Sequence, residues 1–408
     1  MTVTARKNLL YNPFDPVLRV DPYPVYHHIR ATDPIHRSPL GFWALSRYAD
    51  VVVVQRNGNL SYFSQEAMKR LETAVSDLDG AASKVARWMV FTDRGRHRRF
   101  RGLLGHYFTS RAVDGTRSII ERSVRELLDR LPEDRPVNLI EEFARLLPIN
   151  MFCDWLGVPV SDREMVRSWA QSIGRILITV LNPEMMRQMA GAVLAADEYF
   201  TAKVADRRRN PRDDLLTALL RAEYNGEPIS DEEVVSNVTL LIGALNETTV
   251  NLIGNGVLAL LQHPDQLALL RADRSLIVNA VEELLRYDSP SQLQGRYTLE
   301  PLRIGDVEIP AGQRITLMLG AANRDPERFP DPDRLDITRP NVRPTSFGAG
   351  AHHCIGAWLA RLETQVAISM LLDMFPTIEG PVDGVVHWRS EPVAVRALNR
   401  LDLWVSRR

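Results

Sequence analysis

The segment 231–262 constrains the fold most, because it reads as one long helix that is apolar on nearly every face. Ser230 and Glu233 form a capping-box pattern at its start, and acidic residues fill its first turn. The apolar run then extends to Leu261. A helix of about 30 residues without a polar face has to lie inside a large domain. The sequence therefore predicts a helical fold with this segment in its core.

Helical periodicity also dominates the rest of the chain. Short strands are predicted at 35–38, 42–45, 314–319 and 401–405, and the alternating segment 298–309 ends at a turn signal. No internal repeat or composition break marks a linker. We therefore expect a mainly α fold with a minor antiparallel β region, in a single domain 1–408. The further helices are predicted at 22–31, 116–130, 139–156, 185–208, 275–287 and 355–374.

The charge balance excludes several classes of partner. The chain has 50 Lys and Arg against 51 Asp and Glu, a formal net charge of −1, which gives no signal for nucleic acid or a membrane surface. No stretch approaches the roughly 18 uninterrupted apolar residues of a membrane span. Residues 1–12 lack the apolar core of a signal peptide. We therefore expect a cytoplasmic protein that binds neither nucleic acid nor a membrane.

A glycine-rich turn delivers a cysteine to the start of the last predicted helix. Gly348 and Gly350 allow a sharp turn and a close approach to a flat partner, because neither carries a Cβ. N–H groups at a helix start stabilise a thiolate and lower its pKa, which suits Cys354 as a metal ligand. The alternatives are an inert buried cysteine and a zinc site made by His352, His353 and Cys354. Adjacent residues do not readily supply three tetrahedral ligands, which disfavours zinc.

Four polar residues interrupt the apolar central helix, namely Asn246, Glu247, Thr248 and Thr249. Burying a carboxylate and a hydroxyl there is costly unless they are paired or used. One interpretation is that they cap a local bend or bond to preceding carbonyl groups. The other is functional, because a hydroxyl can hold a water while a carboxylate passes protons inward from solvent.

Two further charged patterns stand out. Glu283 and Arg286 lie three residues apart on one face of a predicted helix, although such pairs are common on exposed helices. The dense basic run 94–101 suits a solvated helix face or a patch for an acidic partner. Within it, His97 and Arg101 have the i, i+4 spacing that places them on one face.

Together these segments resemble the cytochrome P450 family, and the chain is similar to its bacterial soluble members. The resemblance implies the cytochrome P450 fold, a triangular helical prism, holding haem b with Cys354 as the axial iron ligand. An axial thiolate favours O–O cleavage, so the implied reaction inserts one atom of dioxygen into an organic substrate. The fixed positions of the family's haem signature are all filled, by Phe347, Gly348, Gly350, His352, Cys354 and Gly356.

The resemblance also implies roles for single residues. Glu247 takes the acid role in catalysis and Thr248 the alcohol role. Glu283 and Arg286 are implied to pair with Arg339 of the irregular segment before the cysteine, in a structural role. The residues implied to bind haem are His97, Arg101, Arg296 and His352, at the propionates, together with Phe347, Gly348, Gly350 and Gly356.

Two positions depart from the family pattern. Leu245 stands where the family usually has the glycine that lets the helix kink over the haem, and we expect its side chain to project into the pocket. An atypical outcome, such as radical coupling, desaturation or peroxide-driven oxidation, is therefore an alternative. Pro344 replaces a histidine that often contacts a propionate, and Arg343 is the nearby substitute.

The pocket positions of the family are apolar here, which predicts a small apolar organic substrate. We expect the hydroxylation or epoxidation of a secondary metabolite, namely a polyketide, macrolide, terpenoid or peptide.

Electrons are expected from NAD(P)H through ferredoxin reductase and a ferredoxin, which docks on Arg98 and Arg99. A non-catalytic haem sensor is the alternative from another class, and a proton-delivering acid and alcohol disfavour it. The expected pocket residues are Leu241, Ala244, Leu245, Leu293 and Val393.

Overall fold

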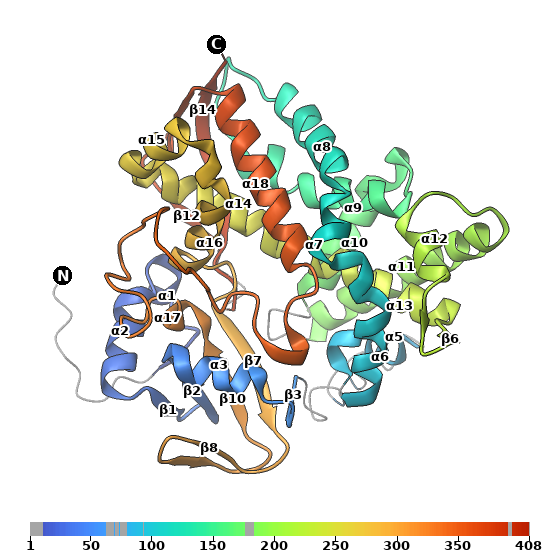
Figure 1. Cartoon of the computed structure of the whole chain (residues 1–408), viewed down its shortest axis with the longest axis horizontal. Coiled ribbons are helices and arrows are strands. Elements are labelled where there is room, and N and C mark those ends of the chain that lie inside the picture. Colours follow the sequence, from blue (N-terminus) through green and yellow to red (C-terminus); the bar gives the residue numbers. More distant parts are fainter. Residues whose placement is uncertain are drawn as a thin grey trace.

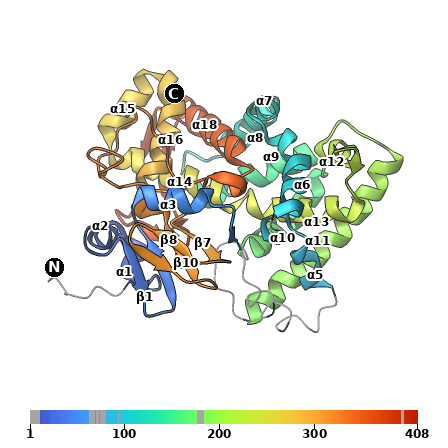
Figure 2. The same cartoon turned by 60° about the horizontal axis from the view of Figure 1, so that its bottom comes forward.

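The structure, a computed structural model, describes residues 11–62, 69, 73, 80–92, 94–175, 183–390 and 394–407. The strands of the principal sheet and the long helices occupy different parts of the molecule (Figure 1). The strands β1, β2, β7 and β10 lie together with the helices α2 (Tyr23–Thr32) and α3 (Tyr48–Arg56), and the view in Figure 2 keeps this separation. The mainly helical fold that the sequence predicts is confirmed.

The principal sheet has five strands in the order β1 (Ile35–Ser38), β2 (Phe42–Leu45), β10 (Arg314–Met318), β7 (Leu293–Thr298) and β3 (Leu60–Ser61). Neighbours run antiparallel except β2 and β10, which are parallel. This pair is the one parallel contact between described strands in a β region that is otherwise antiparallel, as predicted. The 268 residues that separate the two strands (46–313) allow the crossover that a parallel pair needs.

The three-stranded sheet joins two strands from the end of the chain to one from its first half. The strand β14 (Asp402–Ser406) lies between β11 (Thr377–Glu379) and β4 (Val137–Asn138). Two hairpins pair β8 (Leu302–Ile304) with β9 (Val307–Ile309), and β12 (His387–Trp388) with β13 (Leu398–Arg400). The alternating segment predicted at 298–309 is therefore the end of β7 followed by the β8–β9 hairpin.

Most predicted helices occur within two residues of their expected bounds. They are α2, α8 (Arg117–Asp129), α11 (Pro183–Arg209), α16 (Ile277–Tyr287) and α18 (Ala357–Met374). The sequence analysis did not predict α3, α6 (Arg94–Gly105), α10 (Arg163–Gly174) or α15 (Pro264–Ala272). No helix in the described ranges is both long and apolar enough to cross a membrane.

Two predicted helices are interrupted, which corrects the sequence analysis. Segment 139–156 is a π-helical turn, Ile140–Ala144, followed by α9 (Leu147–Leu156), whose first turn contains a proline. The central segment divides into α13 (Asp231–Ala244) and α14 (Glu247–Gln262). At this break Thr249 donates a hydrogen bond to the carbonyl of Leu245, at 3.3 Å. Periodicity alone cannot reveal such a break, because both halves are apolar.

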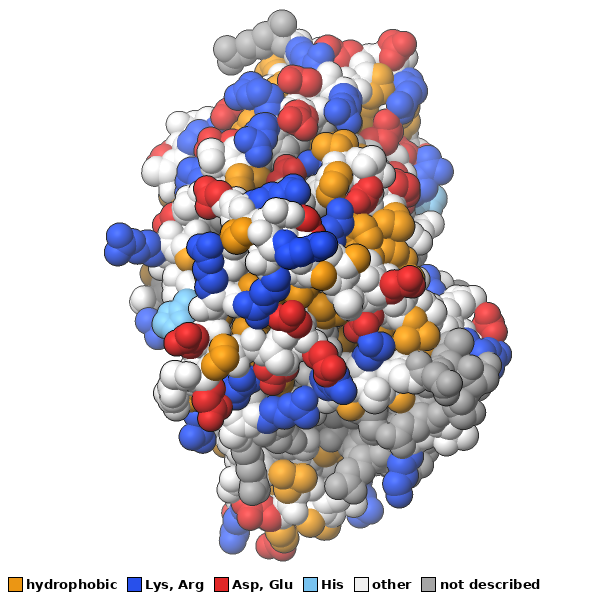
Figure 3. Space-filling view, turned by 90° about the vertical axis from the view of Figure 1, so that its right-hand side faces the viewer, with side chains coloured by type: hydrophobic (Ala, Val, Ile, Leu, Met, Phe, Trp, Pro, Cys, Tyr) orange, Lys and Arg blue, Asp and Glu red, His pale blue; other side chains and the backbone are white. Residues whose placement is uncertain are grey.

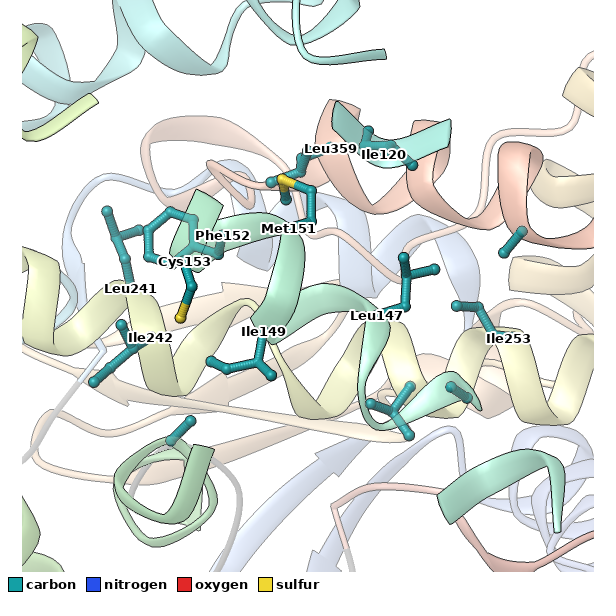
Figure 4. Packing of buried hydrophobic residues seen from close by; sticks show 14 of the residues in the cluster. Ile120, Leu147, Ile149, Met151, Phe152, Cys153, Leu241, Ile242, Ile253 and Leu359 are labelled. Atoms are coloured by element: carbon teal, nitrogen blue, oxygen red, sulfur yellow. The ribbon is translucent and has the colours of Figure 1, made fainter. Parts of the chain in front are cut away.

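The interrupted central helix packs in the principal core, as its composition requires. Figure 4 shows α9 beside it, with Ile149 and Cys153 directed toward Ile242 of α13. On the other side of α9, Met151 is directed toward Leu359 of α18. This packing fixes α13, which ends at the polar break, and α18, which follows the cysteine turn.

Candidate functional site

A cavity of about 240 Å³ lies where the break between α13 and α14, the cysteine turn and β7 meet. Among the described residues that line it, Glu247 is the only carboxylate. The lining includes the predicted residues Leu241, Ala244, Glu247, Thr248, Leu293, His97, Arg101, Phe347, His352 and Cys354. The structure thus brings together residues that span most of the chain.

The cysteine turn is held by its own backbone and by α3. Gly348 and Gly350 adopt φ values of 70° and 72°, which favour glycine, and the Cys354 N–H donates to the Phe347 carbonyl at 2.8 Å. A Cβ on Gly350 would lie 2.8 Å from the carbonyl oxygen of Gln55. The close partner of Gly350 is therefore the end of α3, and neither glycine lines the cavity.

Cys354 is accessible because its side chain faces the cavity, although the site itself lies deep in the protein. Burial raises the pKa of the Cys354 thiol, and the N–H of Gly356 and the guanidinium groups of Arg101 and Arg361 oppose this rise. The N–H at the helix start therefore lowers this pKa as predicted, but burial outweighs it. A bound metal ion would supply the missing stabilisation of the thiolate.

Leu245 does not line the cavity, which corrects the expectation for this position. Its Cδ2 atom lies 2.5 Å from where a Cβ on Gly356 would stand, so the leucine occupies the space that this glycine leaves. Gly356 follows the cysteine closely and begins α18. The side chain thus packs against the cysteine turn. Val393, the other pocket residue that the cavity lining lacks, lies outside the described residues.

Four basic or imidazole side chains gather at the cavity. The rings of His97 and His352 have centroids 4.0 Å apart, and the Arg296 guanidinium lies 4.4 Å from the ring centroid of Tyr62, which lines the cavity. Burial, followed by His97, Arg296 and Arg101, lowers the pKa of His352 to about 3. Such a cluster favours a ligand with negative charge.

Arg343, the expected substitute for a propionate-binding histidine, does not line the cavity. Arg343 is exposed and is not among the cavity-lining residues, so the structure gives it no part in this cluster. No group of three or more His, Cys, Asp or Glu side chains in the described part of the chain is arranged to hold a metal ion. The zinc interpretation of His352, His353 and Cys354 therefore gains no support.

Glu247 and Thr248 form the polar part of the wall at the helix break. Glu247 begins α14 and accepts a hydrogen bond from Arg389, with Nη1 and Oε1 2.5 Å apart. Thr248 is half-buried and lines the same cavity. Thr249 bonds instead to the carbonyl of Leu245, as the first interpretation of the polar cluster predicts for this residue.

Two glycines allow α10 and α13 to cross closely beside Glu247. A Cβ on Gly243 would lie 2.6 Å from Cγ2 of Ile173 and 3.0 Å from the backbone nitrogen of Gly174. A Cβ on Gly174 would lie 3.0 Å from the carbonyl oxygen of Gly243 and 3.8 Å from Oε2 of Glu247. The crossing therefore depends on the absence of side chains at both positions.

Gly243→Ala is expected to lower the free energy of unfolding by about 1–3 kcal/mol, because the added methyl group forces the helices apart. Chemical denaturation measures this loss. Gly191→Ala is the matched control, because Gly191 is an exposed residue within α11 whose added Cβ meets nothing within 4 Å. The control is expected to gain about 0.5–1 kcal/mol. Equal effects of the two substitutions would contradict the tight crossing.

A buried ion-pair network supports the irregular segment that precedes the cysteine. Glu283 and Arg286 are fully buried, with Oε2 and Nε 2.7 Å apart, and Arg339 donates to Glu283 Oε1 at 3.1 Å. The Asp336 N–H also donates to this carboxylate, at 3.0 Å. Arg286 donates in turn to three backbone carbonyls of the segment, those of Asn323, Pro332 and Arg334.

The basic run divides into residues with different surroundings. Arg99 pairs with Glu233 at 2.8 Å, at the start of α13, whereas Arg98 is exposed. Basic and acidic side chains intermingle over the face in Figure 3, which carries α11 and α13. Of the two residues expected to meet an electron donor, Arg99 is thus engaged within the protein.

Two residues of the site escaped the sequence analysis. Arg361 pairs with Glu282, and its guanidinium lies 4.4 Å from the ring centroid of Phe347. It is the fifth residue of α18, little more than one helical turn from the start of the helix, a proximity to the cysteine turn that the sequence does contain. Arg389 lies 142 residues from its partner Glu247, and no local pattern indicates that pairing.

The cavity residues fit a haem group. Cys354 offers a sulfur ligand on a backbone that leaves it open to the cavity, and the cluster of His97, Arg101, Arg296 and His352 suits two carboxylates. Much of the remaining wall is apolar, as a flat macrocycle requires.

Comparisons with known proteins agree with this geometry. The family model described as Cytochrome P450 matches residues 65–385. Cytochrome P450 107B1 of Saccharopolyspora erythraea is 41% identical, over 95% of this chain and 96% of its own length. Vitamin D(3) 25-hydroxylase of Pseudonocardia autotrophica is 38% identical, over 98% of each chain. The solved structure of the bacillaene polyketide synthase cytochrome P450 PksS of Bacillus subtilis has a TM-score of 0.87 and 32% identity, covering 98% of this chain and 100% of that chain.

Proposed function

The chain belongs to the cytochrome P450 family of monooxygenases, and from that premise we propose that Cys354 is the axial ligand of a haem b iron. When bound, the haem supplies the activation of dioxygen, which thiolate ligation favours. The observation that carries the proposal is that Cys354, Glu247 and Thr248 open onto one cavity from different elements.

The cationic cluster would neutralise the haem propionates. His97, Arg101 and His352 line the cavity, and Arg296 lies beside its wall. Burying two carboxylates without such partners would cost several kcal/mol each, roughly. Phe347 contributes to the same wall, while Gly348, Gly350 and Gly356 shape the turn behind it.

Glu247 and Thr248 would supply the protons that the reaction consumes. The Thr248 hydroxyl can hold a water in the cavity and donate a hydrogen bond from Oγ1. The Glu247 carboxylate can take a proton from solvent and pass it inward. Both residues line the cavity, and Glu247 also accepts a hydrogen bond from Arg389 of the C-terminal hairpin.

The substrate would be an apolar organic molecule, and its proposed class is a polyketide, macrolide, terpenoid or peptide. Leu241, Ala244 and Leu293 give the wall its apolar character. The names of two relatives support this class, since one is a vitamin D(3) hydroxylase and the other belongs to a polyketide synthase. Hydroxylation or epoxidation of such a molecule is the proposed reaction.

The proposed reaction is tested by product mass under labelled dioxygen, ¹⁸O₂. A panel of polyketide, macrolide, terpenoid and peptide ligands, with vitamin D3 included, is first screened for shifts of the haem spin state. Insertion predicts a product that gains one labelled oxygen atom. Loss of hydrogen without label would instead favour desaturation or coupling, and NAD(P)H oxidation without product for every ligand would favour a haem sensor.

Electrons are proposed to come from NAD(P)H through a reductase and a small acidic ferredoxin. The exposed Arg98 and the surface around the cysteine turn, where Trp358 is 51% exposed, form the proposed docking surface. Arg99 contributes less than the sequence implied, because Glu233 already holds its guanidinium.

Arg98→Glu is expected to slow ferredoxin-dependent reduction several-fold at low salt, since charge complementarity mainly raises association rates. The difference should shrink as ionic strength rises and screens the charges. Stopped-flow reduction by a surrogate acidic ferredoxin at two or more salt concentrations measures both effects. Arg303→Glu, on the exposed β8–β9 hairpin, is the control. Equal rates for the two variants at every salt concentration would remove Arg98 from the docking surface.

A further inference from the structure

The proposed proton donor is held by a residue from the far end of the chain. Arg389 follows β12, and its Nη1 donates to Oε1 of Glu247 at 2.5 Å. Both side chains are largely buried, with 22% and 17% exposed. A charge-assisted hydrogen bond in such surroundings fixes the orientation of a carboxylate. With Oε1 engaged by the guanidinium, Oε2 is the oxygen that remains for a proton.

The other carboxylate oxygen points away from the hairpin. Oε2 of Glu247 lies 3.8 Å from where a Cβ on Gly174 would stand, at the crossing of α10 and α13. Gly174 itself lines the main cavity. The ion pair therefore sets one oxygen toward Arg389 and the other toward the α10 wall of the cavity.

The hairpin that carries Arg389 is anchored independently of Glu247. Arg389 donates its backbone N–H to the carbonyl of Ala397 at 2.8 Å. The preceding residue, Trp388, stacks on Arg396, whose guanidinium lies 3.6 Å from the ring centroid. Arg396 pairs with Asp288 at 2.6 Å. These contacts place the arginine without help from the carboxylate that it holds.

Arg389 also lines a second, small cavity of about 30 Å³ between the N-terminal segment and the C-terminal hairpin. Two buried atoms of its wall, Gln292 Oε1 and Arg19 Nε, have no hydrogen-bond partner among the described residues. A polar cavity of this size holds at least one water, which would satisfy such atoms. The exposed Ser390 lines it too, so the small cavity reaches the surface.

We propose that Arg389 is a positioning residue for proton delivery, because it holds Oε1 of Glu247 and leaves Oε2 directed toward the α10 wall of the main cavity. This rests on the proposed role of Glu247. Each proton that leaves Oε2 for an acceptor in the main cavity is replaced by one from bulk solvent, so the carboxylic acid is regenerated and no electron moves in the step. Arg389 does not line the main cavity, so it acts there through the carboxylate alone.

The test compares Arg389→Gln, Arg389→Lys and Glu247→Gln with Arg400→Gln, which removes an exposed arginine from the paired strand of the same hairpin. NADPH oxidation is driven by a surrogate ferredoxin and its reductase without organic ligand, in H₂O and in D₂O. Arg389→Gln is expected to slow oxidation about tenfold, toward Glu247→Gln, and to enlarge the solvent isotope effect. Arg389→Lys should restore most of the rate, and Arg400→Gln should match the parent protein.

Thermal unfolding supplies a readout that does not depend on turnover. Arg389→Gln and Glu247→Gln are each expected to lower the midpoint of the haem-loaded protein, and the double variant should fall no further than the lower single variant. Additive shifts would overturn the contact. A normal rate for Arg389→Gln beside a slow Glu247→Gln would overturn the positioning role, whereas a normal rate for Glu247→Gln would overturn the proposed proton donor itself.

Discussion

Replacing Cys354 with serine is expected to remove the thiolate band of the ferrous–CO complex and to reduce NAD(P)H-driven product formation to background. Cys354 is the cysteine that opens onto the cavity. A serine hydroxyl is a far harder and less readily ionised ligand, so the electron donation that favours O–O cleavage is lost. Absorption spectroscopy of the reduced, CO-treated protein measures the first effect directly.

The other cysteine provides the control. Cys153 is fully buried in α9, and burial raises the pKa of its thiol to about 12, which makes it a poor ligand and nucleophile. Cys153→Ala is expected to keep the thiolate band while losing about 1 kcal/mol of stability through the small cavity it leaves. A thiolate band that survived in Cys354→Ser would show that the ligand had been assigned to the wrong residue.

Glu283→Ala is expected to lower the free energy of unfolding by about 3–5 kcal/mol, because it leaves the buried guanidinium of Arg286 without its carboxylate. The same carboxylate holds Arg339 and the Asp336 N–H, so the segment before the cysteine should lose its fixed conformation. Haem content after purification is expected to fall together with stability. Denaturation curves and the haem-to-protein absorbance ratio measure the two losses.

The neighbouring residue tests whether burial causes this effect. Glu282 also pairs with an arginine, Arg361, but both side chains are partly exposed. Glu282→Ala is expected to cost only about 1 kcal/mol, as surface pairs do. If the two variants lost equal stability, the buried network would not be what supports the cysteine turn.

The sequence predicted the regular elements well where local patterns determine them. The strands β1 and β2 match their predicted bounds residue for residue, since alternation and turn residues mark both ends. The break at Leu245 and Asn246 was not predicted, because apolar periodicity continues across it. The parallel pairing of β2 with β10 was also missed, since register between distant strands is a property of the whole fold.

Predictions about the candidate site also succeeded where local motifs determine the feature and failed where tertiary packing does. Cys354 and Glu247 line one cavity, and Glu283 pairs with Arg286 and Arg339 as the resemblance implied. The direction of the Leu245 side chain was predicted wrongly, because it depends on the space left by a glycine more than 100 residues away (356 − 245 = 111). The partner of Glu247 was missed for the same reason, as tertiary packing alone brings Arg389 to it.

The contact between Leu245 and Gly356 links the evolutionary histories of two positions. A side chain at 356 would collide with the leucine, and a smaller residue at 245 would leave a void beside the turn. Each position thus limits the residues that the other accepts, so they should vary together among descendants of this chain. Anyone who reshapes the helix break to admit a new substrate will have to redesign the residue behind the cysteine as well.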